Sequence, residues 1–494
     1  MDTTAAQLDA IKAFVTTPLP DRLRTGDVER RVLTLFHYCA THVPAYRDFL
    51  ERHNVSADRI QTLADYRTLP LMTKDNYIRA YPLPARCPGG TLTACDMIAM
   101  SSGSTGTATV WPRTPAHELD IAYRFEQVLR DGFQGHERRT LAVVCFALGT
   151  WVGGMFTAAC LRHLALKGYP LTVATPGSNK DEIFRVVREL GPHFEQVVLL
   201  GYPPFVKDVI DSGIAAGLDW PRYRPKLVFA GEVFSEEWRA LVCERIGAAD
   251  PRYATASLYG TADGGVLGNE TALSVNIRRF FSERPDAARE AFGESRLPTL
   301  VQYDPSSRYF ESADNTLVVS GDNGVPLIRY HIADKGGLIA CQDLLERVRG
   351  YGFDPLAGLD QNSVRDLPFA YIFGRADFTV SYFGANIYPE NISVGLEQSA
   401  VRKQVSGKFV MQVVETDDHN EALHIVVELL PGANASESLR DTVAATIRAQ
   451  LLRLNSEFAN YVPAQYQMPR IVLKPAGDPE WFPVGVKHRY TRRT

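Results

Sequence analysis

The sequence predicts an α/β protein, with a large N-terminal domain of mostly parallel sheets covered by helices and a small mobile C-terminal α+β domain. Three observations predict this class. A chain of 494 residues is too long for one hydrophobic core. From about residue 140, apolar runs alternate with helical ones, which is typical of βαβ units and a parallel sheet. After Phe373 the sequence resets to a smaller α+β pattern, so we expect domains at 1–374 and 375–494.

The alternation predicts each element in turn. Apolar runs predict strands at 97–100, 141–146, 171–174, 197–200, 227–230 and 256–259. Helices are expected near 155–167, 180–190, 204–216 and 235–246. Shorter β-like runs follow at 316–320 and 327–330, and the C-terminal part holds paired strands at 409–415 and 423–429 and a helix at 435–454. Because ligands bind beyond the carboxyl ends of parallel strands, we expect the loops after Phe146, Ala230 and Tyr259 to converge on one crevice.

Composition excludes several classes of protein. Lys and Arg number 53 and Asp and Glu 57, a net charge of −4 that gives no reason to expect a nucleic-acid partner. The seven cysteines form no C-x-x-C pair, which argues against a disulfide scaffold and for a reducing compartment. No secretory signal is visible, so we expect a cytoplasmic protein without a membrane partner. The uncharged stretch 141–161 is long enough for a membrane span, but its glycines favour a buried strand–loop–helix.

The stretch 101–107 consists only of small polar residues and glycine, directly after the apolar run 97–100. Its residues are Ser101, Ser102, Gly103, Ser104, Thr105, Gly106 and Thr107. Such a loop lets backbone N–H groups and hydroxyls donate to phosphate oxygens. It is not a P-loop, because no Lys follows Gly106. A flexible linker is the alternative interpretation, although linkers seldom run from an apolar strand into aromatic sequence.

Further motifs, taken in chain order, give the sequence a family resemblance. They are Gly231-Glu232, the run Tyr259-Gly260-Thr261-Ala262-Asp263, the stretch 326–334 that ends in Asp334, Gly374-Arg375-Ala376-Asp377, and 384–389. With the loop at 101–107, this order resembles the adenylate-forming superfamily of acyl-CoA synthetases, adenylation domains and luciferases. The stretches 43–47 and 69–74 look like those of its phenylacetate–coenzyme A ligase branch.

The resemblance implies a two-step ligase. A carboxylic acid, aromatic or similarly apolar, attacks the α-phosphate of ATP with Mg²⁺ present, pyrophosphate leaves, and the acyl group passes to coenzyme A. The same first step with an amine or a carrier protein as acceptor, or with a small oxyanion such as nitrite in place of the acid, is the alternative. A nucleotide-binding protein that has lost catalysis is the third. The stretch between Asp263 and Asp334 holds no Cys, so we expect no cysteine-bound zinc there.

The resemblance also assigns roles to single residues. It implies that 101–107 hold the departing phosphates and that Tyr259 covers adenine, while Gly231 leaves room for the base. Asp263 would hold Mg²⁺ and Asp334 would accept from the ribose hydroxyls. The further implied roles are nucleotide binding for Glu232, Gly260, Thr261 and Arg375, a hinge at Asp377, catalysis by Lys487 between carboxylate and α-phosphate, and an acyl pocket of Phe146, Trp151, Ala230 and Ser257.

Each assignment has a structural alternative, and some positions depart from the family pattern. Tyr259 is also consistent with a core aromatic residue, Asp334 with a turn, and Lys487 with a solvated basic tail. The departures are Thr107 for the usual loop lysine, Ala262-Asp263 for Thr-Glu, Ile332-Ala333 for Thr-Gly, Phe378 for the second acidic hinge residue, and Phe383 for an Arg. They bear on metal geometry and on the second step more than on nucleotide binding.

Overall fold

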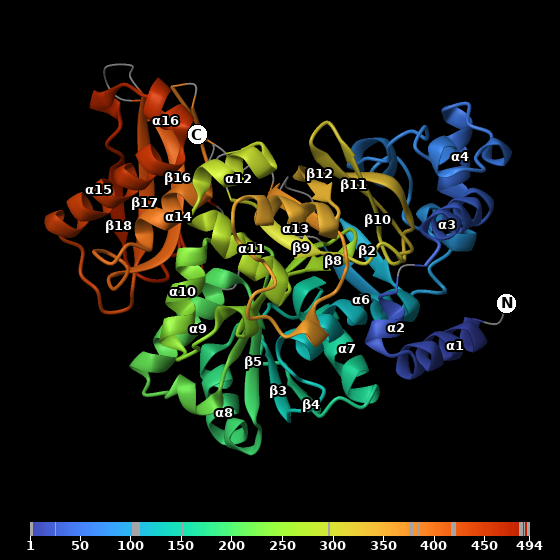
Figure 1. Cartoon of the computed structure of the whole chain (residues 1–494), viewed down its shortest axis with the longest axis horizontal. Coiled ribbons are helices and arrows are strands. Elements are labelled where there is room, and N and C mark those ends of the chain that lie inside the picture. Colours follow the sequence, from blue (N-terminus) through green and yellow to red (C-terminus); the bar gives the residue numbers. More distant parts are fainter. Residues whose placement is uncertain are drawn as a thin grey trace.

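A computed structural model describes most of the chain. The described residues are 3–24, 26–100, 109–150, 152–294, 297–374, 380–383, 385–415, 421–483, 488 and 490–491. They form two units, which we call the large unit (described residues up to 374) and the C-terminal unit (from 380 on). Figure 1 shows the C-terminal unit, in orange to red, at one end of the molecule, and the blue helices α3 and α4 at the other.

The large unit is organised around one sheet with the strand order β10-β11-β12-β13-β9-β8-β7-β6-β5-β3-β4. Five strands, β3 (Thr140–Val144), β4 (Leu171–Ala174), β5 (Gln196–Gly201), β6 (Lys226–Ala230) and β7 (Thr255–Thr261), are parallel to one another. The connecting helices are α7 (Val152–Leu166), α8 (Lys180–Leu190), α9 (Pro203–Ala215) and α10 (Glu236–Arg245). This half of the sheet confirms the predicted βαβ alternation.

The other half of the sheet is antiparallel, which the sequence pattern did not indicate. Its strands are β8 (Gly265–Asn269), β9 (Thr299–Gln302), β10 (Tyr309–Ala313), β11 (Thr316–Gly321), β12 (Leu327–Ile339) and β13 (Phe369–Gly374). The helices α11 (Ala272–Ser282), α12 (Pro285–Phe292) and α13 (Cys341–Gly350) accompany them. The largest departure from the predicted elements is β12. A short strand is expected at 327–330, and β12 is 13 residues long in all.

Alternation along β3 explains why both faces of the sheet are covered. Leu141 and Val143 belong to one hydrophobic core together with residues of α8, α9 and α10. Ala142 and Val144 point the other way, into a core shared with α6 (Pro115–Gln127) and α7. All five residues of β3 are buried, and the described part of 141–161 is a strand, a loop and a helix, as predicted, although Gly149, Thr150 and Met155 are exposed. None of the helices in the described part of the chain is both long and apolar enough to cross a membrane.

Most of the N-terminal segment packs against the antiparallel half, whereas Phe14, Leu19 and Leu23 near its start belong to the core shared with α6 and α7. Its elements are α1 (Thr3–Thr16), α2 (Leu19–Arg22), α3 (Val28–His42), α4 (Pro44–Arg52), α5 (Leu63–Tyr66), β1 (Met97–Met100) and β2 (Val110–Arg113). Met72 connects it to β12, since its N–H donates to the carbonyl of Arg329 at 3.0 Å and its carbonyl accepts from the N–H of His331 at 2.8 Å. This bridge brings the stretch 69–74 next to the middle of β12.

The C-terminal unit has its own hydrophobic core. Its elements are β14 (Val380–Tyr382), β15 (Ala385–Ile387), α14 (Pro389–Leu396), β16 (Val405–Glu415), β17 (Glu421–Leu429), α15 (Glu437–Leu454), α16 (Ser456–Tyr461) and β18 (Arg470–Lys474). β16 and β17 pair antiparallel, as predicted, and β18 joins β17 in parallel. α14 and α15 approach closely at Gly395, where a Cβ would lie 2.6 Å from the Cα of Ile447.

Candidate functional site

The candidate residues fall into two groups. The loop 101–107, Trp151, Arg375, Asp377 and Lys487 lie outside the described residues. The others lie at the carboxyl ends of β3, β6 and β7, in the loops that follow, and on β12.

Tyr259 and Asp334 are far apart in sequence and meet in the structure. The hydroxyl of Tyr259, near the end of β7, donates to Oδ2 of Asp334 at 2.7 Å. Asp334 is buried and lies inside β12 rather than in a turn. The residue before it, Ala333, has φ of 65°, and the pairing of β11 with β12 is irregular over this stretch. An aromatic ring and a buried carboxylate therefore lie in direct contact.

Asp263 lies in the turn between β7 and β8 with its side chain only 4% exposed. Its Oδ2 accepts a hydrogen bond from the hydroxyl of Tyr330 at 2.5 Å and is 3.7 Å from the ammonium nitrogen of Lys74. Asn323 donates to its backbone carbonyl at 3.3 Å. Lys74 and Tyr330 are not among the predicted site residues, although both belong to stretches that carry the family resemblance.

Two buried basic side chains lie next to the turn at 262–265 and support it. Arg113 donates to the carbonyl of Ala262, and its Nη1 is 3.4 Å from Nδ1 of His117. Burial lowers the pKa of Arg113 to about 10 and lowers the pKa of His117 well below its usual range. His117 is therefore neutral at pH 7, and Arg113 is the cation beneath this turn. The sequence contained no periodic or spacing signal for either role.

The loop after β6 requires glycine at 231. Gly231 has φ of 87°, and a Cβ there would lie 2.7 Å from the ring of Tyr202. That ring also meets Phe146 edge to face, with centroids 5.0 Å apart. Tyr202 thus lies between two predicted site residues, where the sequence analysis had not placed it. Gly231 is needed for this close approach, and the role that the resemblance implies for it stays a prediction.

Of the predicted acyl-pocket residues in the described part of the chain, Ala230 and Ser257 lie on the neighbouring strands β6 and β7, and Phe146 follows β3. Phe146 and Ser257 are buried, and Ala230 is half-buried at the end of β6. In the sheet register Phe229 lies opposite Ser257. The N–H of Ser257 donates to Glu270 at 2.8 Å, and Arg239 donates to the other carboxylate oxygen of Glu270 at 2.6 Å. These buried charges hold β7 in place without entering the site.

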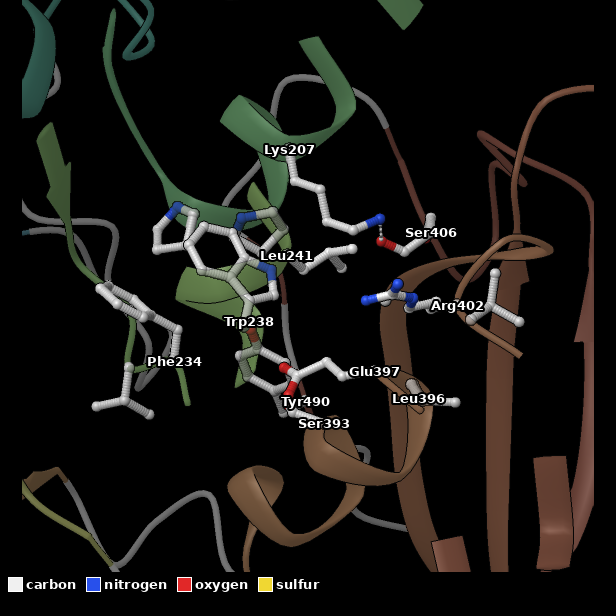
Figure 2. A pocket seen from close by; sticks show the side chains of 15 residues that line it. Lys207, Phe234, Trp238, Leu241, Ser393, Leu396, Glu397, Arg402, Ser406 and Tyr490 are labelled. Carbon is white, nitrogen blue, oxygen red and sulfur yellow. Dashed lines mark hydrogen bonds between the residues drawn. The ribbon is translucent and has the colours of Figure 1, made fainter. Parts of the chain in front are cut away.

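The C-terminal unit meets the large unit around a small cavity of about 30 Å³, which contains none of the predicted residues. Figure 2 shows this cavity, with Lys207 bonded to the carbonyl of Ser406 at 2.8 Å and with Trp238 and Glu397 on its wall. Ser235 donates to Glu397 at 2.5 Å. Burial raises the pKa of Glu397 to about 8, so this carboxyl is protonated at neutral pH.

One departure from the family pattern has a structural explanation. Phe383, which replaces an Arg of the family, stacks on the ring of Tyr466 with centroids 4.9 Å apart and meets Tyr382 edge to face. The aromatic ring is thus part of the C-terminal core. An arginine at this position would lose that packing.

No family model and no curated protein matches this sequence. Solved structures do match the structure of this chain. A 2-hydroxyisobutyryl-CoA ligase in the postadenylation state, in complex with R3-HIB-AMP, has a TM-score of 0.68 and 15% identity, over 96% of this chain and 92% of that one. The same ligase in the postadenylation state with 2-HIB-AMP has a TM-score of 0.66 and 16% identity, over 94% of this chain and 89% of that one. The same ligase in the thioesterification state, with 2-HIB-AMP and CoA, has a TM-score of 0.54 and 15% identity, over 97% of this chain and 91% of that one. This chain therefore has the fold of an acyl-CoA ligase along nearly its whole length.

Proposed function

We propose that the protein is an AMP-forming ligase that joins a carboxylic acid to ATP, releases pyrophosphate, and passes the acyl group to coenzyme A. The observation that carries the proposal is the bond between Tyr259 and Asp334. It places a ring that can cover a base next to a carboxylate that can accept from two ribose hydroxyls. Because a fold alone does not define a reaction, the likeness to an adenylate-bound CoA ligase adds support only together with this site.

Asp263 fits the proposed Mg²⁺ site, although the described residues hold no group of three or more metal-ligating side chains. Mg²⁺ takes one or two protein carboxylates and completes its shell with substrate phosphates and water. Both contacts of the Asp263 side chain described above use Oδ2, so Oδ1 is the oxygen that would face the metal. Bound there, Mg²⁺ would neutralise phosphate charge. Tyr330 and Lys74 would orient the carboxylate, and Lys74 would add the positive charge that Thr107 does not supply.

The acid that we propose is apolar or aromatic. The buried ring of Phe146 and the half-buried Ala230 supply an apolar wall near the end of the parallel strands. Tyr202 covers Phe146 from one side and thereby narrows the space beside Gly231. Trp151 and Ser257 are proposed to complete the pocket. The phenylacetate-ligase branch, with its aromatic acids, stays a prediction of the sequence motifs.

The two half-reactions would use two arrangements of the chain. We propose that 1–374 bind ATP and the acid, that 375–494 rotate about Asp377, and that Lys487 bridges the carboxylate and the α-phosphate in the first step. The likeness to the postadenylation structures exceeds that to the thioesterification structure, with TM-scores of 0.68 and 0.54. This difference supports an arrangement of the two units close to the one that follows adenylation.

A pyrophosphate-release screen across carboxylic acids tests the proposal. The purified protein is given ATP, Mg²⁺ and one acid at a time, and the screen is repeated with CoA, with amines and with a carrier protein. We expect release with a subset of apolar acids, and faster turnover with CoA than with the other acceptors. Turnover with an amine but not with CoA would replace the acceptor and keep the adenylation. ATP binding without any acid-dependent release would favour the nucleotide-binding protein that lacks catalysis.

A further inference from the structure

The last described residues of the chain are attached to the C-terminal sheet. The N–H of Met411 in β16 donates to the carbonyl of Tyr490 at 2.8 Å, and Met411 and Thr491 form an isolated parallel bridge. His488 contacts the carbonyl of Phe409 at 2.7 Å. The ring of Tyr490 packs on Phe409 with centroids 5.1 Å apart. Tyr490 therefore belongs to the C-terminal unit and would move with it.

The hydroxyl of Tyr490 crosses to the large unit. It donates to Oε2 of Glu232, the residue directly after Gly231 in the loop that follows β6. Burial and the nearby Glu232 carboxylate raise the pKa of Tyr490 well above its usual range, so the phenol stays protonated and remains a donor. A hydrogen bond to an ionised acceptor is about twice as strong as a neutral one.

Among the described residues, the other polar contacts between the units lie at the rim or around the cavity, and Arg245 also donates to the carbonyl of Arg402 at 3.4 Å. At the rim, Arg402 lies 3.4 Å from Glu244 and Arg453 lies 3.8 Å from Glu237, with both glutamates well exposed. Exposed ion pairs of this kind stabilise an interface little. Around the cavity, the bonds of Lys207 and Ser235 hold β16 and α14 on α9 and α10. Tyr490 lines the same cavity, and its partner Glu232 lies directly next to Gly231, at the opposite end of the loop after β6 from Ser235.

We infer that Tyr490 is a positioning residue, whose bond to Glu232 docks the C-terminal unit on the loop after β6 in the arrangement used for adenylation. The effect of this bond on the half-reactions rests on the proposed function. Its effect on the docking of the two units rests on geometry alone. Lys487 is three residues before Tyr490 in the sequence. A bond that fixes Tyr490 on the large unit therefore also tethers the proposed catalytic lysine. The bond must break before the unit rotates, so it favours the first half-reaction over the second.

The structural test measures a distance between the two units with pulsed electron–electron spectroscopy. Spin labels are attached to cysteines placed at the exposed positions Arg222 and Asp441, in a background with Cys95→Ser, because Cys95 alone among the cysteines is not buried. We expect one dominant distance for this labelled protein. Tyr490→Phe, which removes only the hydroxyl, should add a second and broader population. The matched control is Tyr382→Phe, whose hydroxyl bonds to the carbonyl of Tyr466 within the C-terminal unit and should leave the distance unchanged.

The kinetic test separates the two half-reactions. Tyr490→Phe should slow adenylate formation about ten-fold, the scale of losing a hydrogen bond to a charged group, and should spare transfer from a supplied acyl-adenylate. Glu232→Ala removes the same bond from the other side, and the double variant should cost no more than either single one. An unchanged distance distribution in Tyr490→Phe, or equal slowing of both half-reactions, would overturn the inference. If the unmodified protein forms no adenylate, the proposed function fails, and the distance measurement still decides the role of Tyr490.

Discussion

At the scale of single residues, the candidate site depends on buried polar groups that satisfy one another. Asp334 accepts from Tyr259, and Asp263 accepts from Tyr330 beside Lys74. A buried carboxylate without such donors would be costly, so these contacts stabilise the fold as well as shape the site. The motifs predicted the two acids. They could not predict which donors face them, because Tyr330 and Lys74 come from distant segments, which are joined by the bridge at Met72 and by other contacts such as that of Arg329 with the carbonyl of Leu69.

Asp334→Ala should weaken ATP binding by about ten- to a hundred-fold, the effect of losing hydrogen bonds to a charged acceptor. It also leaves the hydroxyl of Tyr259 without the acceptor described here. Isothermal titration calorimetry measures the change. The control is Asp314→Ala, an exposed aspartate between β10 and β11, which should bind ATP normally. Equal affinities of Asp334→Ala and the unmodified protein would remove Asp334 from the nucleotide site.

At the scale of elements, the alternation of apolar and helical runs predicted β3 to β7 and the helices between them within a few residues. The reason is clearest for β3 and β5, which are buried on both faces and appear as continuous apolar runs. The pattern failed for the second half of β12, where polar and small residues such as Lys335, Gly336 and Gly337 extend the strand. Pairing with β11 and β13 holds this half of the strand, and no local propensity indicates such pairing.

Gly231→Ala should destabilise the protein by about 2 kcal/mol or more, since it adds left-handed backbone strain to a clash with Tyr202. Gly352→Ala is the matched control. Gly352 has φ of 80° but open space around its Cβ position, so only the backbone cost of about 1 kcal/mol applies. Chemical unfolding of both variants gives the comparison. Equal losses of unfolding free energy would show that the contact between Gly231 and Tyr202 is unimportant.

At the scale of the whole molecule, two units with separate cores meet through polar contacts around a small cavity. Apolar side chains such as Phe234, Trp238 and Leu396 also line the cavity, so opening the interface would expose apolar surface as well as break these polar contacts. Interfaces between domains of one chain commonly permit relative motion unless they are large and apolar. The sequence predicted a boundary at 375–378 from the change of pattern, and this stretch lies outside the described residues. It did not predict the interface itself, since Lys207, Glu397 and Tyr490 lie far apart in the chain and carry no motif.

The interface should weaken as pH rises. The pKa of Glu397 is raised by burial from its ordinary value of 4.5 to about 8, despite the bond from Ser235 and the nearby Lys207 and Arg278. Docking therefore binds a proton. The contribution of protonated Glu397 to docking is complete below pH 4.5. It is lost as the pH rises from there to about 8, and the docking equilibrium constant falls by as much as ten-fold per pH unit.

This loss can be followed by measuring the spin-label distance between pH 5 and 9, which reports the docked fraction. Glu397→Gln, which resembles the protonated acid, should make the docked fraction insensitive to pH in this range. Glu437→Gln, a change at an exposed glutamate in the first turn of α15, should keep the dependence of the unmodified protein. A docked fraction that stays constant from pH 5 to 9 in the unmodified protein would show that Glu397 does not control the interface.

The most direct test of the central claim is detection of the acyl-adenylate itself. The protein is mixed with ATP, Mg²⁺ and an acid that supports pyrophosphate release, without any acceptor, and the quenched mixture is examined by mass spectrometry. We predict about one acyl-AMP per protein molecule. Lys487→Ala should form it roughly 10²- to 10³-fold more slowly with nearly unchanged ATP affinity, because the lysine would act mainly in the transition state. Pyrophosphate release without any acyl-AMP, or formation of AMP that does not depend on the acid, would contradict the account.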